Sequence, residues 1–467
     1  MKKFLLCLAV FALATQLNAQ IQLLAIGNLT QSKAGVYTDL SGLHNTLESG
    51  VPANLLGGMG SAIAHASGNT FLALPDRGPN ADPYDDAVDN TTSYIARFHT
   101  IDMDLQPNGS GAGLPYTLTP TLRRTTLLWS LTPLVYGTGE GLGVGSGVPP
   151  QNNFFQHFFT GRSDNFDPNQ NSGNPRNARL DPEGIRISND GFSVFVSDEY
   201  GPYVYQFDRL LGLRVRSFKL PDNLYSPILS PVGQVEITNN TTGRVANKGM
   251  EGLAITPDGK TLVGMMQNAL IQDAAQGGAA KNLLRIVSID IRSGKTKEFA
   301  YLLTTGSGVS EILALNNHEF LVDERDGKGR GDGSKAKVKQ IFKIDLANAV
   351  EVTDMDGPTA AANAVGKSLF LDIVATLTAP PISIDPKQIP AKLEGISFGP
   401  DVAQGSIKLH TFWVANDNDF ESVVDTGNGD ETTFDNPTQF FVFGFTDTDL
   451  QGSTLVPQQF PRGCDRW

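Results

Sequence analysis

One short pattern recurs along this chain and constrains its fold more than any other feature. It opens with Glu-Gly and a small apolar strand, continues through a turn, and enters a second strand that ends in acidic or amide side chains. Three copies open at Glu183-Gly184, Glu251-Gly252 and Glu394-Gly395, and a fourth opens at Glu311 without the glycine. Repetition of one unit along the sequence is typical of folds built from structural repeats.

Each copy contains enough β-forming runs for four short strands. In the copy that opens at Glu183, the second strand ends at Asp198 and the third at Asp208; third strands also run into Asp290 and Asp345. Four-stranded units repeated in sequence predict the blades of a β-propeller, an all-β fold. A β-sandwich, the alternative all-β fold, does not explain a repeat of this length.

A fainter copy begins earlier in the chain. Ser61 stands where the other copies have Glu, and Asp76 follows it by fifteen residues, the separation of Glu183 from Asp198. The sequence therefore predicts five blades, and the interval from Ser61 to Glu183 is long enough for a possible sixth. The run 21–29 could complete the last blade and close the ring, which would remove exposed strand edges.

The first residues predict export to the periplasm or the cell exterior. Lys2 and Lys3 precede an apolar run over 4–14, and the small residue Ala19 follows. This is the pattern of a signal peptide, over residues 1–19, with an earlier cleavage site after Ala14 as an alternative. The other interpretation, a buried N-terminal strand, does not explain why these three features coincide.

The remaining chain, 20–467, is expected to be a single propeller domain. No stretch in it is apolar for the ~20 residues that a membrane helix needs. Cys7 lies in the predicted signal peptide and leaves Cys464 alone, so no intrachain disulfide is expected after processing. Two polar segments, 136–179 and 425–436, interrupt the repeat and are predicted to be insert loops on a propeller face.

Charge limits the partners. The chain has 36 Lys and Arg against 49 Asp and Glu, a formal net charge of −13. Loss of Lys2 and Lys3 leaves 34 basic against 49 acidic side chains, a net charge of −15. This balance disfavours nucleic acid and anionic membranes as partners, and it suits a protein that holds cations.

The repeated Glu is the first candidate for chemistry. The first strand of a propeller blade lines the central channel, so these carboxylates are predicted to converge near one mouth and to share protons or a cation. Hard oxygen ligands favour Ca²⁺. The predicted metal ligands are Glu183, Glu251, Glu311 and Glu394. The alternative is that each Glu bonds the backbone of a neighbouring blade and sets its register.

The second strands end nearby and supply further acids and two arginines. The predicted catalytic residues are Asp198, Glu251 and Asp323, and the predicted substrate-binding residues are Arg77, Lys248 and Arg325. Carboxylate-held metal beside arginine suits phosphate-ester chemistry, because charge develops on the phosphoryl oxygens. The alternative is that Arg77 and Arg325 only neutralise the adjacent acids.

The sequence lacks other common hydrolase motifs. It contains no Gly-x-Ser-x-Gly elbow and no His-Glu-x-x-His zinc motif, and its six histidines are scattered.

At the residues of the repeat the chain resembles the Phytase-like family, which is described by the esterase-like activity of phytase. The matching stretches follow one order over about residues 55–445: Ala73–Asn80, Asp181–Ile185, Phe195–Gly201, Asn247–Leu253, Glu319–Arg325, Lys392–Ile396 and Asn416–Phe420. The resemblance implies a secreted propeller with phosphatase- or esterase-type activity. It transfers no catalytic residue, so the candidate residues depend on the repeat.

Two functions follow as hypotheses. The first is a secreted, Ca²⁺-dependent hydrolase of phosphate esters or other small esters, with a small anionic ester as substrate. The second is a non-catalytic propeller that binds a ligand or partner on its loop face and holds Ca²⁺ as a structural ion.

Overall fold

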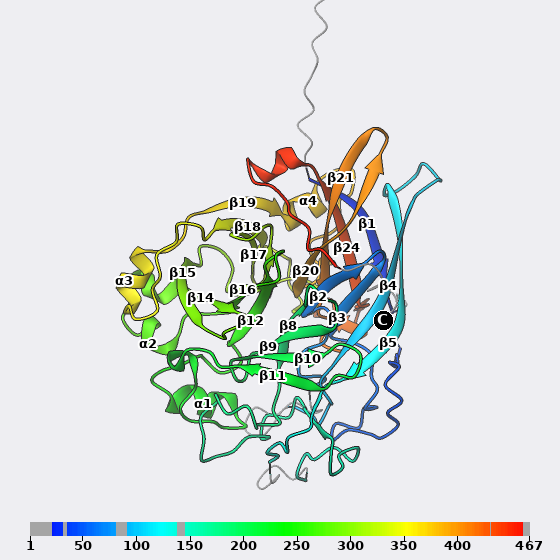
Figure 1. Ribbon diagram of the computed structural model, residues 1–467. Coiled ribbons are helices and arrows are strands. Elements are labelled where there is room, and N and C mark those ends of the chain that lie inside the picture. Colours follow the sequence, from blue (N-terminus) through cyan, green and yellow to red (C-terminus); the bar gives the residue numbers. More distant parts are fainter. Residues whose placement is uncertain (1–20, 31–34, 81–90, 138–144, 430, 461–467) are drawn as a thin grey trace, which may run out of the picture.

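Five antiparallel sheets of four strands stand around a common centre in the computed structural model (Figure 1). The structure describes residues 21–30, 35–80, 91–137, 145–429 and 431–460. The predicted five-bladed β-propeller is confirmed. The predicted signal peptide and both cysteines lie outside the described residues.

Each blade is numbered here from its inner strand outward. Blade 1 consists of β2 (Ala62–Ser67), β3 (Thr70–Leu74), β4 (Arg97–Pro107) and β5 (Tyr116–Leu127). Blade 2 consists of β8 (Pro182–Ile187), β9 (Ser193–Asp198), β10 (Tyr203–Asp208) and β11 (Arg214–Phe218). Blade 3 consists of β12 (Met250–Ile255), β13 (Thr261–Met266), β14 (Leu283–Asp290) and β15 (Thr296–Leu302).

The last two blades complete the ring. Blade 4 consists of β16 (Gly308–Ala314), β17 (Glu319–Arg325), β18 (Lys339–Asp345) and β19 (Lys367–Asp372). Blade 5 consists of β20 (Leu393–Gln404), β21 (Ile407–Asn416), β24 (Gln439–Phe445) and β1 (Gln22–Asn28). The N-terminal strand thus supplies the outer strand of the last blade, as predicted, and its residues pair with β24 from Gln22–Gly444 to Asn28–Gln439.

The glycine of the repeat has a packing role. The inner strands β2, β8, β12, β16 and β20 each pack against the next around the ring. A Cβ atom on Gly252 of β12 would lie 2.8 Å from the backbone nitrogen of Ile312 in β16. On Gly395 of β20 it would lie 2.9 Å from the backbone of Ala62 in β2. Only glycine therefore lets these inner strands approach so closely.

The core lies between blades, because the alternating side chains of a strand face both neighbours. On β17, Phe320 and Val322 pack with blade 3, whereas Leu321 packs with blade 5. Trp413 of β21 and Phe71 of β3 meet between blades 5 and 1, with ring centroids 4.6 Å apart.

The interval that could hold a sixth blade contains no further four-stranded sheet in its described residues. Part of its length is taken by the long hairpin of β4 and β5 in blade 1. The rest carries a two-stranded sheet, β6 (Trp129–Ser130) with β7 (His157–Phe158). The insert 136–179 holds only β7 in its described part, and 425–436 belongs to the hairpin of β22 (Val423–Asp425) and β23 (Thr433–Asp435).

Helices are short and lie between strands, except for η3, which follows β24. They are η1 (Asp222–Leu224), α1 (Gly233–Asn239), α2 (Ile271–Ala274), η2 (Gly278–Asn282), α3 (Gly357–Ala362), α4 (Ile373–Thr378) and η3 (Asp447–Leu450). Within the described ranges, none is long and apolar enough to cross a membrane.

Candidate functional site

The repeated Glu residues lie where the pairing of each inner strand with its neighbour is irregular. The pairing register shifts between Pro182 and Ile185, between Met250 and Gly252, between Val309 and Glu311, and between Leu393 and Ile396. A bulge of this kind re-aims a side chain. The inner strands of blades 2, 3 and 5 begin beside this point, and we call this end of the channel the acidic mouth.

Three glutamates form the tightest group there, which we call the carboxylate cluster: Glu183 of β8, Glu199 directly after β9, and Glu251 of β12. Each offers a carboxylate oxygen within 4.8 Å of the others, and all three are buried. Burial first, and then the repulsion of Glu251 and other carboxylates, raises the pKa of Glu183 and of Glu199 well above the usual range.

The two carboxylate oxygens of Glu251 differ in their hydrogen bonding. Gln267, directly after β13, donates from Nε2 to Oε1 of Glu251 over 2.8 Å. Oε2 is buried and has no hydrogen-bond partner among the described residues. Burial and the charge of Glu394 raise the pKa of Glu251 to about 8, although Arg325 and Gln267 oppose the shift. A buried, unpaired carboxylate oxygen is costly unless a proton or a cation satisfies it.

Two further carboxylate groups adjoin the cluster through Asp76, which follows β3. Asp76 groups with Asp181 and Glu183, and separately with Asp417 and Asp419. Burial raises the pKa of Asp76 to about 7, with Arg77 opposing and Asp181 adding to the shift.

Cations already neutralise most of these outer carboxylates. Arg77 Nη1 donates to Asp181 Oδ2 over 3.0 Å. Lys392 Nζ lies 3.0 Å from Asp417 Oδ2 and also binds Asp419. The contacts of Arg77 therefore agree with the alternative interpretation, in which this arginine neutralises a neighbouring acid. The carboxylate cluster itself is the group that lacks such a partner in close contact among the described residues.

The two remaining predicted ligands, Glu311 and Glu394, belong to none of the carboxylate groups of the described residues. Oε1 of Glu311 accepts from the backbone N–H of Leu253 in the next blade over 2.8 Å, and Oε2 lies 3.0 Å from Arg186. Glu394 binds Arg325. Glu311 thus makes the contact that the register-setting alternative predicts. The geometry brings Glu199 to Glu183 and Glu251 in their place.

Asp198 and Asp323 differ in their surroundings. Asp198 Oδ1 accepts from the backbone N–H groups of Asp181 and Tyr200, each over 3.1 Å, which fixes the turn after β9. Burial raises its pKa to about 7 despite these bonds. Asp323 of β17 is fully buried, and neither of its carboxylate oxygens has a hydrogen-bond partner among the described residues. Burial raises the pKa of Asp323 well above its usual value.

A cavity of about 220 Å³ is lined by Gln267, the residue that donates to Glu251. Two predicted substrate-binding residues line it: Lys248, which is exposed, and Arg325, which donates to Ser310 and Glu394. The other lining residues include Gln267, Asn268 and Ser307. Arg77 lies apart from this cavity and binds Asn247 at its edge over 2.7 Å.

The insert 136–179 reaches the acidic mouth. Gly161 passes so close to Arg77 that a Cβ atom would lie 1.7 Å from the Arg77 carbonyl oxygen. The Tyr200 hydroxyl donates to the Gly161 carbonyl over 3.3 Å. The insert therefore borders the predicted site on the blade 1 side.

Sequence reasoning assigned no role to Asp181, Lys392 or Gln267, which all belong to this site. Asp181 and Lys392 share one signal, because each stands two positions before a repeated Glu. Gln267 occupies the strand end that carries an acid in blades 2 and 4, so only the local repeat position points to it.

The fold and this site define a five-bladed β-propeller with a carboxylate-lined channel mouth. The family model Phytase-like, described as esterase-like activity of phytase, matches residues 54–420. The chain belongs to this family.

Similarity to individual proteins is more limited. An uncharacterized secreted protein of Arthroderma benhamiae is 33% identical over a 212-residue alignment that covers 38% of this chain. The match spans 41% of that relative's own length. The periplasmic gluconolactonase of Pseudomonas aeruginosa is 11% identical, with a TM-score of 0.32, over 87% of this chain and 98% of that one. The β-propeller domain of Myceliophteria thermophila Cps50 (Swd1) is 12% identical, with a TM-score of 0.23, over 51% of this chain and 53% of that one.

Proposed function

We propose that the protein is an exported, metal-dependent hydrolase of phosphate esters or other small esters, acting at the acidic mouth. The observation that carries the proposal is the unpaired, buried Oε2 of Glu251 inside the carboxylate cluster; Gln267, which donates to Oε1, lines a cavity with Lys248 and Arg325. Membership of the Phytase-like family supports an ester as the substrate.

The cluster fits a hard divalent cation. Glu183, Glu199 and Glu251 would hold it through carboxylate oxygens, the ligand type that Ca²⁺ prefers. Burial raises the pKa of Glu251 to about 8, so without a cation this carboxyl holds a proton near neutral pH. A bound Ca²⁺ would supply a Lewis acid that polarises an ester oxygen and lowers the pKa of water.

The other residues bind and orient. Lys248 attracts an anionic ester into the cavity, and Arg325, whose charge is paired with Glu394, lines the same cavity. Gln267 fixes Oε1 of Glu251, so that Oε2 keeps one direction. Asp198 and Asp323 remain predicted catalytic residues; the backbone bonds of Asp198 suit a role in positioning the Glu199 side chain that follows it.

Export and partners complete the proposal. The signal-peptide pattern of residues 1–19 and the similarity to a secreted protein of Arthroderma benhamiae both support an exported protein. The net negative charge supports a small substrate over nucleic acid.

The test is hydrolysis by the chain from residue 20 onward of p-nitrophenyl phosphate and p-nitrophenyl acetate, with Ca²⁺ and with EDTA. We expect turnover of at least one ester in Ca²⁺ and its loss in EDTA, restored by added Ca²⁺. Glu351→Gln, an exposed acid paired with Lys297 on the surface, is the matched control and should behave as the unmodified chain.

The second candidate is the binding propeller with a structural Ca²⁺, favoured by the salt bridges that neutralise Asp181 and Asp417. A folded, Ca²⁺-loaded sample that hydrolyses neither ester supports this candidate and contradicts the enzymatic proposal.

A further inference from the structure

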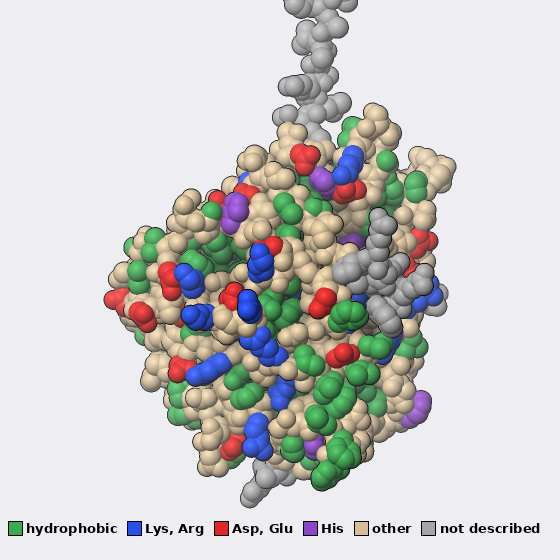
Figure 2. Space-filling model, viewed as in Figure 1, with side chains coloured by type: hydrophobic (Ala, Val, Ile, Leu, Met, Phe, Trp, Pro, Cys, Tyr) green, Lys and Arg blue, Asp and Glu red, His purple; other side chains and the backbone are tan. Residues whose placement is uncertain are grey.

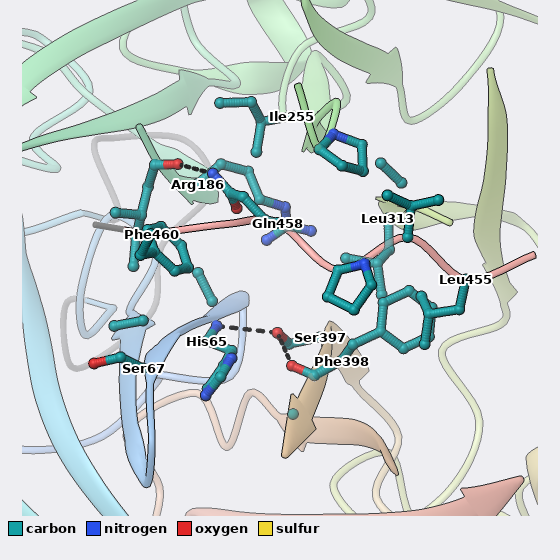
Figure 3. A pocket seen from close by; sticks show the side chains of 18 of the residues that line it. His65, Ser67, Arg186, Ile255, Leu313, Ser397, Phe398, Leu455, Gln458 and Phe460 are labelled. Atoms are coloured by element: carbon teal, nitrogen blue, oxygen red, sulfur yellow. Dashed lines mark hydrogen bonds between the residues drawn. The ribbon is translucent and has the colours of Figure 1, made fainter. Parts of the chain in front are cut away.

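A second cavity lies at the opposite end of the channel, where the inner strands β2, β8, β12 and β16 end; we call this end the second mouth. Its volume is about 300 Å³. Figure 3 shows side chains from several inner strands pointing into it. Its apolar walls include Ala64, Ile187, Ile255, Leu313 and Phe398. Small-molecule sites are concave, mainly apolar and at least of about this size, ~300 Å³.

Arg186 of β8 forms the inner end of this cavity and separates it from the acidic mouth. Its Nη1 donates to the carbonyls of Ile63 and Ile185 over 3.0 and 2.6 Å, and Nη2 donates to that of Ile312 over 3.0 Å. Its Nε–H is buried and has no hydrogen-bond partner in the part of the chain that the structure describes. The side chain that carries this unpaired donor lines an apolar cavity, and an acceptor atom that reached the donor would satisfy it.

The cavity has no unbalanced charge for an ion to bind. The Arg186 guanidinium is paired with Glu311. Asp401 at the rim lies 2.7 Å both from Lys408 Nζ and from His410 Nδ1. Burial lowers the pKa of His65, which keeps its ring neutral at neutral pH. A neutral ligand is thus favoured over a metal cation or a carboxylate.

The outer wall is a segment near the C-terminus, residues 453–460, which we call the strap. Figure 1 shows it (red) crossing in front of the centre of the ring, and Figure 2 shows the same face with Lys and Arg side chains gathered over its middle. The backbone N–H of Val456 donates to Leu315 over 2.9 Å, and Gln458 Nε2 donates to Ile187 and Asn189 over 2.7 and 2.6 Å. The strap forms neither helix nor strand, so it can move without breaking a sheet.

We propose that the second mouth is a binding site for a small, neutral, mainly apolar molecule with one hydrogen-bond acceptor. The acceptor binds Arg186 Nε, the apolar body packs against the walls from β2, β12 and β16, and the strap covers the ligand. This site is separate from the carboxylate cluster and needs no metal.

Three probes of similar shape test the proposal by isothermal titration calorimetry: toluene, acetophenone and benzoate. One net hydrogen bond makes acetophenone bind about threefold to tenfold more tightly than toluene. Benzoate binds more weakly than acetophenone because its charge loses its hydration in a cavity whose arginine is already paired.

Variants locate the site. Leu313→Trp fills the cavity and abolishes acetophenone binding, and Ala314→Leu, a smaller change at the next position, weakens it if the first variant fails to fold. Ile407→Trp, on the exposed surface of β21, is the matched control and leaves binding unchanged. Equal affinity for toluene and acetophenone, full binding to a folded Leu313→Trp protein, or no binding of any probe up to its solubility overturns the proposal.

Discussion

The two mouths of the channel are built from the same inner strands and have opposite chemistry. At the acidic mouth, the carboxylate cluster and its neighbours crowd like charges together, and burial raises their pKa values. At the second mouth, the walls are apolar and the one arginine is paired. Because Glu recurs at the first position of several repeats, the sequence predicted the acidic mouth. The second mouth has no repeated polar residue, so the sequence did not predict it.

Arg186 separates the two mouths, and its removal should have the largest effect. Arg186→Met leaves Glu311 buried without its cation and breaks bonds to blades 1 and 4. We expect a loss of about 3–5 kcal/mol in the free energy of unfolding, measured by urea denaturation. Adding Glu311→Gln should recover part of this loss, because it removes the unpaired charge. A stability loss below about 1 kcal/mol would show that Arg186 does not hold the blades together.

Glu251→Gln should affect the acidic mouth alone. Replacing the carboxylate by an amide removes a negative ligand from the cluster, and we expect at least about a hundredfold loss of Ca²⁺ affinity and of ester turnover. Melting curves with and without Ca²⁺ measure the first, since a native-state ligand raises the melting temperature by mass action. Acetophenone binding at the second mouth should remain. Turnover by Glu251→Gln equal to that of the unmodified chain would remove Glu251 from the site.

Asp323→Asn should change the pH dependence of stability. Because its pKa is raised in the folded protein, Asp323 takes up a proton on folding; its contribution is fully favourable below the unfolded pKa of about 4 and is lost as the pH rises through the folded pKa. The charges around it are those of Arg325, Lys339, Glu394 and Glu311. Between these two pKa values, the unmodified chain should lose about 1.4 kcal/mol per pH unit relative to Asp323→Asn.

Urea denaturation of both proteins at pH 5 and pH 8 measures this difference. Asp290→Asn, on the exposed end of β14, is the control and should not show it. Parallel stability curves for Asp323→Asn and the unmodified chain would mean that Asp323 is ionised in the folded state.

Lys248→Ala should give the smallest effect. The side chain is exposed and lines the same cavity as Gln267, so its loss should raise KM for the anionic ester about threefold to tenfold and leave kcat nearly unchanged. Lys260→Ala, a surface lysine on blade 3, is the matched control. A fall in kcat at constant KM would instead place Lys248 in the reaction step.

The sequence predicted the blades because the repeat marks each inner strand. It also predicted that the 21–29 run closes the ring. It did not predict that Glu residues at the same repeat position would make different contacts. Glu183 and Glu311 open equivalent strands, yet Glu311 turns to Arg186 and to the backbone of Leu253. Arg186, the ion-pair partner, determines where the Glu311 side chain lies. Arg186 belongs to no repeated motif, so no sequence pattern indicated this contact.

Other features were hidden for different reasons. The extra length between Ser61 and Glu183, which suggested a sixth blade, is used by the long β4–β5 hairpin and the insert 136–179, and chain length alone cannot distinguish these from a blade. The strap has no strand or helix period, so its place over the second mouth follows only from tertiary contacts such as that of Val456 with Leu315.

The closure of blade 5 by β1 has a consequence for how the protein folds. Gln22 pairs with Gly444 and Asn28 with Gln439, so a strand near the start of the described chain pairs with one more than four hundred residues later. Blades 1 to 4 each consist of consecutive strands and can form by local pairing, whereas blade 5 is complete only after a loop of about four hundred residues has closed. Ring closure is therefore expected to be a late step of folding, and an intermediate with an exposed β24 edge is expected to be prone to aggregation.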